Sequence, residues 1–556
     1  MKFNGAELTI AMLKRHGIDV VAGIPGGASL PLYDALGRSD LRHVLARHEQ
    51  GAGFIAQGIA RATGRPAVCL GTSGPGATNL LTAIADAKLD SIPLIALTAQ
   101  VPRKMIGTDA FQEIDTYGLT VPITKHNFQV RAVEELLAVM PEAFRIAISG
   151  RPGPVAVDIP KDVLTESLEV ESLPEPPRAD RPPRIGRDDL LRAADMINAA
   201  QRPMLLIGAG VIAAEASDDL RALMERASIP AASTLLGLGA LPNEHPLFVG
   251  MVGMHAARYT NLLLEECDLL IGIGIRFDDR ATGKAAEFCP RAQILHLDID
   301  PSELGKIKNP SLGIMGDARE FLRAIFSLIT PKRRLEWMLH MVALRERHPL
   351  MMPGASDPLR PYGIVRCAAE ALPRDAIIAT DVGQHQMWVA QAYPFSYPRQ
   401  FLTSGGLGTM GFGLPAAIGA ALAMPDRTVA CFSGDGSLLM NLQELATAAE
   451  ENVNVKIILL NNEHLGLVRQ QQQLFYGRRF FASRFHARTD FVAIARGFGL
   501  DAIDLGRMED PIEALSEALT APGPCLIHVP IDAEENVYPM VPPGGANRDM
   551  IGGEAR

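Results

Sequence analysis

Short apolar runs alternate with amphipathic stretches along almost the whole chain. Each run is bounded by glycine, proline or polar turn residues, and the stretches between runs have the apolar spacing of helices packed on one face. The clearest runs are RPAVCLGT (65–72), PLIALTA (93–99), PVAVDIP (154–160), PMLLIGAG (203–210), DLLIGIG (268–274), QILHLDID (293–300), AIIATD (376–381), TVACFSGDG (428–436) and VKIILLNN (455–462). Buried strands that alternate with helices are typical of parallel sheets covered on both faces, so we expect an α/β fold.

Two proline-rich segments divide this pattern into three parts. They are ESLPEPPRADRPPRIG (171–186) and RHPLMMPGASDPLRPYG (347–363), and both have the composition of extended linkers. We therefore predict three doubly wound parallel-sheet domains, comprising residues 1–170, 187–346 and 362–556. Ligands of such sheets bind at the carboxyl ends of the strands, so the residues directly after each apolar run are the candidates for chemistry.

The composition argues against several classes of partner. The net charge is −10 and no basic stripe stands out, which argues against nucleic acid and anionic membranes as partners. No apolar run reaches the roughly 18 residues of a membrane span. The first residues lead straight into an amphipathic helix, without the features of a signal peptide. The six scattered cysteines form no CxxC pair and indicate reduced core residues of a cytoplasmic protein.

Two runs of the third part end in side chains that carry oxygen. TVACFSGDGS places Asp435 between Gly434 and Gly436, and VKIILLNN delivers Asn462 about one βαβ unit later. A carboxylate and an amide carbonyl form an incomplete oxygen ligand set of the kind that suits Mg²⁺, which completes its octahedron with phosphate and water. The flanking glycines would let a diphosphate approach the backbone. The alternative is a tight turn and an asparagine cap.

At this point the chain resembles the acetohydroxyacid synthase (acetolactate synthase) large subunits, which are thiamine diphosphate-dependent enzymes. The similarity is carried by GDG followed by NN, by DVGQHQMW (381–388) and by SGGLGTMGFGLPAAIG (404–419), and it extends nearly end to end towards the bacterial isozyme I type. The resemblance implies a pyrimidine-binding, an FAD-binding and a diphosphate-binding domain, in that order. It assigns the metal to Asp435, Asn462 and the backbone of His464, and the rest of the thiamine site to Gln384, His385, Gly408, Met410, Gly434, Gly436 and Ser437.

The first part supplies an acid for this cofactor. Glu49 lies in LARHEQGAGFIAQGIAR (45–61), between a polar turn and an apolar helix start. An enclosed carboxyl group can share a proton with the aminopyrimidine ring, and the motif RHEQGA resembles the activating glutamate of the family. The alternative is a solvated glutamate in a first helical turn. The resemblance further implies a reaction channel formed by Gly27, Phe111, Gln112 and Lys161. By residue pattern alone, GIPGG (23–27) is a tight turn, Phe111 a core residue and Lys161 a surface residue.

The middle part predicts a dinucleotide site. PMLLIGAGVI has the order strand, glycine turn and helix, although one GxG is weak evidence for a nucleotide. By resemblance the FAD-binding residues are Arg151, Gly208, Gly210, Arg276, Asp298, Asp300 and Asp317. In this family FAD has no part in the net reaction. Arg280 is expected to hold the carboxylate of the second substrate through its planar guanidinium, the alternative being a salt bridge with Asp278 or Asp279.

A run of glutamines departs from the family pattern. Most members have G-M-V-x-Q-W-Q where this chain has LGLVRQQQQ (465–473), so Leu467 replaces a methionine and Gln471 replaces a tryptophan. Loss of one apolar contact of this size changes preference by about 1–3 kcal/mol, or roughly 10–200-fold. We therefore predict weak discrimination between pyruvate and 2-ketobutyrate as acceptor. The alternative is a polar helix face that serves solubility.

The resemblance implies one reaction and leaves rivals to test. Pyruvate is decarboxylated on thiamine diphosphate, and the hydroxyethyl unit is ligated to pyruvate or 2-ketobutyrate. The product is 2-acetolactate or 2-aceto-2-hydroxybutyrate, on the route to valine, leucine and isoleucine. A homodimer with active sites at its interface is implied, and assembly with a small regulatory subunit is compatible with it. The rivals are glyoxylate carboligase, pyruvate oxidase, a non-catalytic nucleotide-binding protein and an NAD dehydrogenase.

Overall fold

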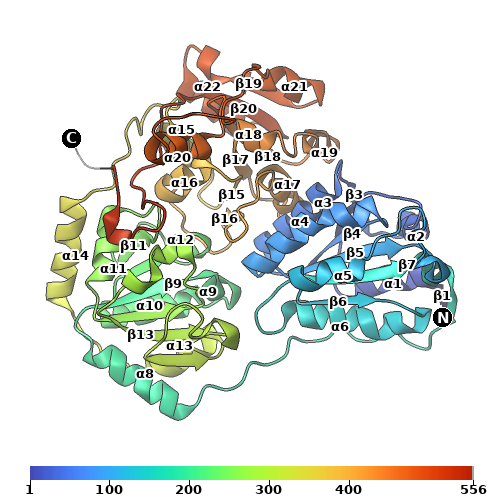
Figure 1. The fold of residues 1–556 in the computed structure, drawn as a ribbon, viewed down its shortest axis with the longest axis horizontal. Coiled ribbons are helices and arrows are strands. Elements are labelled where there is room, and N and C mark those ends of the chain that lie inside the picture. Colours follow the sequence, from blue (N-terminus) through green and yellow to red (C-terminus); the bar gives the residue numbers. More distant parts are fainter. Residues whose placement is uncertain (554–556) are drawn as a thin grey trace.

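Three sheets of six strands each organise residues 1–553, which are the residues that the computed structural model describes (Figure 1). Every strand pairing within these three sheets is parallel, and helices separate consecutive strands. The predicted fold class, three doubly wound α/β units, is confirmed. No helix of the described residues is long and apolar enough to cross a membrane.

The N-terminal sheet has the strand order β3-β2-β4-β5-β7-β6. Its strands are β2 (Val20–Gly23), β3 (Arg42–Leu45), β4 (Ala67–Gly71), β5 (Leu94–Gln100), β6 (His126–Gln129) and β7 (Val155–Pro160). Its helices are α1 (Gly5–Arg15), α2 (Leu30–Gly37), α3 (Glu49–Thr63), α4 (Pro75–Asp90), α5 (Thr116–Thr120), α6 (Leu136–Ile148) and α7 (Lys161–Thr165). A short antiparallel pair, β1 (Lys2–Asn4) with β8 (Ser167–Glu169), joins the two ends of this domain.

The central sheet has the order β11-β10-β9-β12-β13-β14. Its strands are β9 (Pro203–Ile207), β10 (Ala231–Ser233), β11 (Phe248–Met251), β12 (Leu269–Ile273), β13 (Gln293–Asp298) and β14 (Leu312–Met315). Its helices are α8 (Arg187–Ala199), α9 (Ala209–Ala213), α10 (Ser217–Ala227), α11 (Arg258–Glu265), α12 (Asp279–Thr282), α13 (Ala318–Phe326) and α14 (Leu335–Arg347).

The C-terminal sheet has the order β16-β15-β17-β18-β20-β19. Its strands are β15 (Ile377–Thr380), β16 (Phe401–Leu402), β17 (Val429–Gly434), β18 (Val455–Asn461), β19 (Asp501–Asp504) and β20 (Cys525–Pro530). Its helices are α15 (Pro361–Ala371), α16 (Gln384–Ala392), α17 (Gly413–Ala423), α18 (Asp435–Leu438), α19 (Glu444–Glu450), α20 (Gly466–Phe475), α21 (Phe491–Gly497) and α22 (Pro511–Thr520).

Each sheet reverses its strand order at one point, and this point locates a crevice. The order turns between β2 and β4 in the N-terminal sheet, between β9 and β12 in the central sheet, and between β15 and β17 in the C-terminal sheet. Loops that leave two strands in opposite directions separate there, so ligands of open α/β sheets bind at such switch points. The fold therefore offers three crevices for the predicted site residues.

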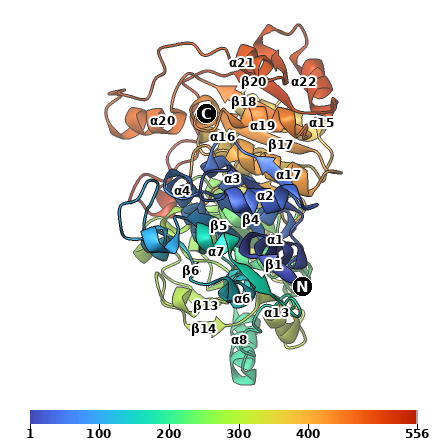
Figure 2. The same cartoon turned by 90° about the vertical axis from the view of Figure 1, so that its right-hand side faces the viewer.

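Helices α3 and α17 hold the N-terminal and C-terminal domains together, and they lie side by side in both views (Figures 1 and 2). Their backbones approach so closely that a side chain on Gly58 would overlap the carbonyl of Ala416, and one on Gly419 would overlap that of Ile55. The rings of Phe54 and Phe412 pack edge to face at 5.3 Å beside this crossing. Close packing of this kind fixes the relative position of the two domains.

Candidate active site

The C-terminal sheet brings together the oxygen-bearing residues that follow two neighbouring strands, of which β17 borders the switch point. β17 pairs directly with β18, with Gly434 opposite Leu460, so the prediction that these strand ends are neighbours is confirmed. Asp435 is the first residue of α18 and only 4% of its surface is exposed. One carboxylate oxygen accepts the backbone N–H of Gly436 at 2.9 Å. The other is buried and has no hydrogen-bond partner among the described residues.

The electrostatics of Asp435 fit a cation. Burial raises the pKa of its carboxyl to about 7, although nearby backbone N–H groups act in the opposite direction. A buried acceptor without a partner is costly, and a bound divalent ion would remove that cost. Asn462 is also buried; its side-chain oxygen accepts the N–H of His464 at 3.0 Å, and its amide donates to Gln384 at 3.3 Å. An amide oxygen has a second lone pair, so Asn462 can still serve as a ligand.

The first turn of α16 lies beside this acid. Gln384 donates from its amide to the side-chain oxygen of Gln470 and to the carbonyl of Glu535, both at 2.9 Å. His385 is fully enclosed, and burial lowers the pKa of its imidazole to about 3, so the ring is neutral near pH 7. Its Nε2 has no hydrogen-bond partner within residues 1–553. A second orphaned polar atom therefore lies in the crevice that holds Asp435.

The glycines around Asp435 make room for side chains of neighbouring loops. A Cβ on Gly434 would lie 2.9 Å from Nδ1 of His385, and one on Gly436 would lie 2.7 Å from Leu465. Ser437 donates its hydroxyl to the carbonyl of Val382 at 2.7 Å, which ties α18 to the turn after β15. The predicted diphosphate residues are thus adjacent, and both glycines are required by packing.

Sequence reasoning missed Asp381, which organises the same crevice. It is buried, its carboxylate accepts the N–H of Val382 at 2.9 Å and of Gly411 at 2.8 Å, and burial raises its pKa to about 6. The signal was available, because Asp381 directly follows the apolar run AIIATD (376–381) just as Asp435 follows its own strand. Asp381 connects the turn after β15 to the loop that carries Met410.

Met410 lies in a glycine-rich loop, residues 403–411. Gly408 and Gly411 both have left-handed backbone conformations, with φ of +68° and +88°. Asn441 donates to the carbonyl of Gly411 at 2.7 Å, and a Cβ on Gly411 would lie 2.9 Å from the same amide nitrogen. Glycine is required at both positions, since other residues rarely adopt this conformation. Met410 itself is partly exposed, between these two turns.

The switch point of the N-terminal sheet holds Glu49. This residue begins α3 and is buried, so the alternative of a solvated glutamate is wrong. Asn79, on the first turns of α4, donates its amide to Glu49 at 2.9 Å. The hydroxyls of Thr72 and Tyr33 are buried without partners in the described part of the chain, and burial together with the charge of Glu49 raises the pKa of Tyr33. A Cβ on Gly27 would meet no atom within 4 Å.

This half-site gathers polar groups around Glu49, and the neighbouring Gln50 accepts a hydrogen bond from Asn441 of the C-terminal domain at 3.3 Å. Sequence reasoning missed Asn79, although the turn GTSGPGATN (71–79) places it directly after a strand and a helix start. The single hydrogen bond of the Glu49 side chain described in residues 1–553 is the one from Asn79. No hydrogen bond or ion pair described there joins Glu49 to Asp435 or to the turn that follows β15.

The predicted channel residues lie on exposed loops. Phe111 is 87% exposed, so the alternative of a core phenylalanine is wrong. Gln112 has a φ of +60°, and its backbone lies against Gly74, where a Cβ would come within 2.8 Å of the Gln112 carbonyl. Glu113 holds the loop together, because its carboxylate accepts backbone N–H groups of Gly107, Thr108 and Ala110. Lys161, the first residue of α7, is partly exposed. This exposure lies between that expected of a channel residue and that expected of a surface residue.

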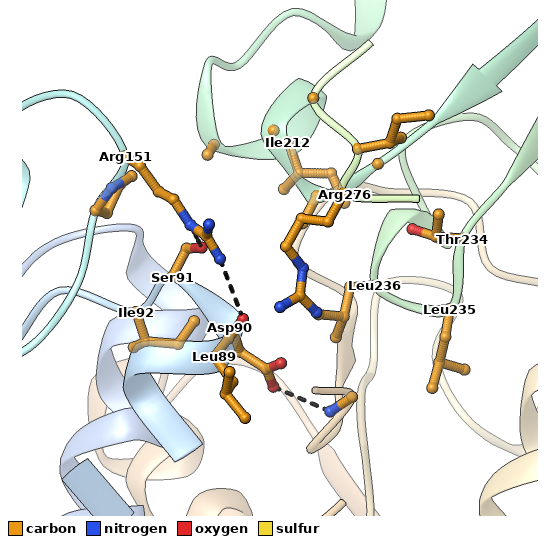
Figure 3. Close-up of a pocket in the computed structure, with 18 of the residues that line it drawn as sticks. Leu89, Asp90, Ser91, Ile92, Arg151, Ile212, Thr234, Leu235, Leu236 and Arg276 are labelled. Carbon is orange, nitrogen blue, oxygen red and sulfur yellow. Dashed lines mark hydrogen bonds between the residues drawn. The ribbon is translucent and has the colours of Figure 1, made fainter. Parts of the chain in front are cut away.

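The switch point of the central sheet opens into a cavity of about 580 Å³ between the three domains (Figure 3). A volume of this size suits a cofactor. The predicted residues that line it are Arg151, Gly208, Gly210, Arg276, Arg280, Asp298, Asp317, Gly408 and Leu467. A side chain on Gly208 would overlap the carbonyl of Gly274, and a Cβ on Gly210 would lie 2.6 Å from Cα of Gly274. Glycines here let the loops after β9 and β12 pack against each other.

The charged groups of this cavity fit a dinucleotide. Asp298, at the end of β13, is buried, and burial raises the pKa of its carboxyl to about 6. Arg151 reaches the wall from the N-terminal domain, anchored to Glu303 at 2.7 Å and to Ser91 at 2.7 Å, while Arg276 approaches from the central domain (Figure 3). Guanidinium groups suit a diphosphate, and an acid after a strand suits a ribose hydroxyl. Asp300 is not part of the wall.

Asp300 and Arg280 have roles that the sequence left open. Asp300 accepts the N–H of Ser302 at 3.0 Å and pairs with Arg151 at 3.4 Å, so it supports the wall from behind. Arg280 pairs with Asp279 at 3.6 Å, as the structural alternative predicts, but its side chain is 67% exposed. Arg280 also lines the cavity, and its guanidinium donates to the sulfur of Met254 at 3.7 Å. Asp317 caps α13 by accepting the N–H of Glu320 at 2.9 Å.

The four glutamines of α20 divide into two kinds. Gln470 is buried and bonds to Gln384 and to both backbone groups of Val537. Gln472 donates to the carbonyl of Phe481, and Gln473 accepts from Arg469 and Asn536. Gln471 alone has no hydrogen-bond partner in the described structure, and Leu467 lies one turn earlier on the cavity wall. Three glutamines are structural, and no hydrogen bond described in residues 1–553 engages the side chain of the fourth. A helix that is polar only for solubility does not account for these contacts.

Comparisons with known proteins agree with this arrangement. Models of the thiamine pyrophosphate enzyme family match in order: the N-terminal TPP binding domain at residues 3–119, the central domain at 190–325 and the C-terminal TPP binding domain at 381–529. The acetolactate synthase isozyme 1 large subunit of Escherichia coli is 58% identical over 99% of this chain and 98% of its own. The isozyme 2 large subunit of the same organism is 45% identical over 99% of both chains. The chloroplastic acetolactate synthase 1 of Nicotiana tabacum is 44% identical over 98% of this chain and 84% of its own. The chain therefore belongs to the acetolactate synthase large-subunit family of thiamine pyrophosphate enzymes.

Proposed function

We propose that this chain is the catalytic subunit of an acetohydroxyacid synthase. It decarboxylates pyruvate and joins the remaining two-carbon unit to a second 2-ketoacid, pyruvate or 2-ketobutyrate. The observation that carries the proposal is the buried Asp435, whose unpartnered carboxylate oxygen lies beside Asn462 and the unpartnered His385. Buried polar groups are usually hydrogen-bonded, so a bound cation and an anionic ligand would satisfy these atoms.

The cofactors assigned to this site are thiamine diphosphate and Mg²⁺. Asp435 and Asn462, with the backbone of His464, would hold the metal, and Gln384, His385 and the turn at Gly434 would hold the diphosphate. When bound, thiamine supplies a carbon nucleophile that accepts the negative charge released by decarboxylation. Glu49, held by Asn79, is placed in an enclosed site where it can share and return a proton.

The remaining residues act on the substrates. Arg280 can bind a carboxylate bidentately, because its guanidinium is exposed at the cavity wall. Phe111 and Gln112 lie on a loop that Glu113 holds in shape, and a half-exposed Lys161 lies at the start of α7. Together they would orient the second ketoacid and exclude water from the site.

The cavity between the domains is assigned to FAD. Its size, the glycine turn after β9, Asp298 and two arginines support a dinucleotide, as argued above. We propose a structural role for it, because acetohydroxyacid formation involves no net oxidation. Pyruvate oxidase is the rival here, and it predicts a flavin that becomes reduced during turnover without oxygen.

A homodimer, a small regulatory partner and a cytoplasmic location complete the proposal. The dimer is supported by Phe111 and Phe481, which are 87% and 84% exposed and would be covered by a second chain. The relatives' designation as large subunits supports the small partner. Six free cysteines support a reducing compartment.

The test is a product assay with the full chain, thiamine diphosphate, Mg²⁺ and FAD. We expect acetolactate from pyruvate, and Glu49→Gln should lower kcat about 100–1000-fold, which is within the range for loss of a proton-transfer group. Thiamine diphosphate should still bind the variant, as measured by calorimetry. The absorbance of the flavin should stay that of the oxidised form in anaerobic turnover. Cofactor binding without any acetolactate would contradict the proposal in favour of a non-catalytic protein.

A further inference from the structure

A buried ion cluster lies at the contact between the N-terminal and C-terminal domains. Arg61 of α3 pairs with Asp86 at 3.0 Å and with Asp90 at 2.9 Å, both on α4, and the three side chains are at most 7% exposed. Gln57 also accepts from Arg61, and the guanidinium lies 4.8 Å over the ring of Phe412. Two carboxylates face one guanidinium, so the cluster has more carboxylate lone pairs than Arg61 can satisfy. The remaining lone pairs need hydrogen-bond donors from other residues.

The surplus acceptors are satisfied by one loop of the other domain. Asp90 accepts the backbone N–H of Gly405 at 3.0 Å and of Gly406 at 2.7 Å. Asp86 accepts the hydroxyl of Thr409 at 2.9 Å and that of Ser404. Figure 3 shows Asp90 reaching from the end of α4 to a backbone nitrogen across the domain boundary. The donors come from both ends of the segment 404–409.

This loop requires outside support. It is glycine-rich, so its unfolded backbone has more freedom to lose than an ordinary segment. Residues 406–408 are exposed, and Gly408 adopts a left-handed conformation with a φ of +68°. The contacts within its own domain are near the start of the loop, where Gln386 donates to Thr403 at 2.7 Å and to the carbonyl of Ser404 at 3.0 Å. Beyond Ser404, the loop is held by Asp86 and Asp90 of the N-terminal domain and by Ser404 itself, whose hydroxyl oxygen accepts the N–H of Thr409 at 2.8 Å. At its end, Asp381 and Asn441 bind Gly411.

The loop lies between the two proposed cofactor sites. Ser404, Gly405 and Gly408 line the cavity assigned to FAD, together with Arg61 and Asp90 themselves. A Cβ on Gly406 would lie 3.2 Å from the guanidinium of Arg276, on the opposite wall. Met410 follows directly and is assigned to the thiamine site. A displacement of this loop would therefore change both sites.

We infer that Arg61, Asp86 and Asp90 are positioning residues, which fix the loop 403–411 so that it forms one wall of the flavin cavity and presents Met410 to the thiamine site. The inference rests on the proposed function, since it assumes these two cofactors. It assigns no chemical step to the cluster. The N-terminal domain thus determines part of the geometry of the C-terminal site within one chain, because its buried carboxylates accept hydrogen bonds from the loop.

The test uses two variants of the contact and one matched control. Asp90→Asn replaces an acceptor of two loop N–H groups by an amide, and Thr409→Val removes one loop donor while leaving all charges of the cluster in place. Asp158→Asn is the control, because Asp158 is equally buried in the N-terminal domain but accepts from Thr98 at 2.7 Å and Gln100 at 3.2 Å, both in its own domain.

Two readouts separate positioning from general stability. The first is hydrogen–deuterium exchange of the peptide covering 401–412 in the cofactor-free full chain. We expect exchange to rise about fivefold or more in Asp90→Asn and Thr409→Val, with the thermal midpoint close to that of the control. The second is the rate of FAD dissociation from the loaded enzyme, which should rise by a similar factor in both variants and not in Asp158→Asn.

Each outcome decides a different point. Unchanged exchange in both variants, or equal increases in all three proteins, would overturn the inference while leaving the proposed function intact. Faster loop exchange with unchanged FAD dissociation would overturn the link between the loop and the cavity. A wild-type chain that takes up no FAD and forms no acetolactate would overturn the proposed function, and the inference would fail with it. If Asp90→Asn does not fold, Thr409→Val alone decides.

Discussion

The crevices of the central and C-terminal sheets have the same origin but different designs. Both open at a topological switch point, and both begin with glycines directly after a strand, GAG in one and GDG in the other. In the central sheet the glycines let two backbone loops pack together, and Gly208 has no room for a side chain beside Gly274. In the C-terminal sheet they leave room for the side chains of His385 and Leu465.

The buried carboxylates of the two crevices also differ in their hydrogen bonding. Asp298 of the central crevice has its hydrogen bond from the N–H of Asp300 at 2.9 Å, and its surroundings include Arg151. Asp435 of the C-terminal crevice has a carboxylate oxygen with no partner in residues 1–553. A glycine turn after a strand therefore predicts only a crevice. The unpaired oxygen of Asp435 is the feature by which this crevice differs from the central one, and a bound cation would satisfy it.

The sharpest test of this contrast is Asp435→Asn. We expect kcat/KM for acetolactate formation to fall at least about a thousandfold, since a catalytic metal supplies several kcal/mol of charge stabilisation. Thiamine diphosphate should bind only weakly at any Mg²⁺ concentration, as calorimetry would measure, and FAD should be retained. Asp504→Asn is a matched control, because Asp504 also ends a strand of this sheet but pairs with Arg507 at 3.2 Å. Equal losses in both variants would contradict the metal assignment.

Gln471→Trp tests which ligand the fourth glutamine of α20 faces. The bulky ring would restore an apolar contact, so we expect the preference for 2-ketobutyrate over pyruvate to rise about 10–200-fold. The measurement is the ratio of the two acetohydroxyacids formed in competition. Gln473→Trp is unsuitable as a control because Gln473 bonds to Arg469 and Asn536, so Gln471→Ala serves instead and should leave the ratio low. An unchanged ratio in Gln471→Trp would show that Gln471 faces away from the acceptor.

The sequence predicted most of what depends on strand ends and less of what depends on contacts between distant loops. The clearest apolar runs located nine of the eighteen strands of the three described sheets, and the residues at the ends of those strands included Asp435, Asn462 and Asp298. Asp381 was missed although it follows the same rule. The enclosure of Glu49 by Asn79 was beyond prediction, since it depends on how β2 and β4 separate.

The cavity shows the same limit. Asp300, two residues beyond Asp298, was expected to bind FAD. The backbone bends between the two residues, so Asp300 pairs with Arg151 behind the wall of the cavity. The contact of Arg61, Asp86 and Asp90 with the loop 403–411 joins residues more than three hundred positions apart. No local pattern encodes such a pairing, because each partner alone has the composition of an ordinary helix or turn.

Gly208→Ala tests the packing role of the glycine turn in the central crevice. The added methyl group would overlap the carbonyl of Gly274, so the loops after β9 and β12 must separate. We expect a loss of about 1–3 kcal/mol of stability and a clearly faster release of FAD, measured by urea unfolding and by flavin fluorescence. Gly37→Ala is the control, because a Cβ there meets no atom within 4 Å. A variant that unfolds normally and keeps its flavin would contradict the packing argument.

The smallest expected effect concerns Asp298 in the cofactor-free chain. Burial raises the pKa of its carboxyl from an ordinary 3.8 to about 6 in the folded state. Since the folded state binds the proton more tightly, this group stabilises the fold below about pH 4, and the benefit is lost as the pH rises through about 6. The side chain introduced by Asp298→Asn does not titrate. The difference in unfolding free energy between variant and wild type should therefore be about 1–1.5 kcal/mol more in favour of the variant at pH 7.5 than at pH 5. Urea unfolding of both proteins at the two pH values measures this difference, and other titrating groups cancel in it. An equal gain at both values would mean that Asp298 stays ionised in the fold, and the central crevice would then be far more polar than its burial indicates.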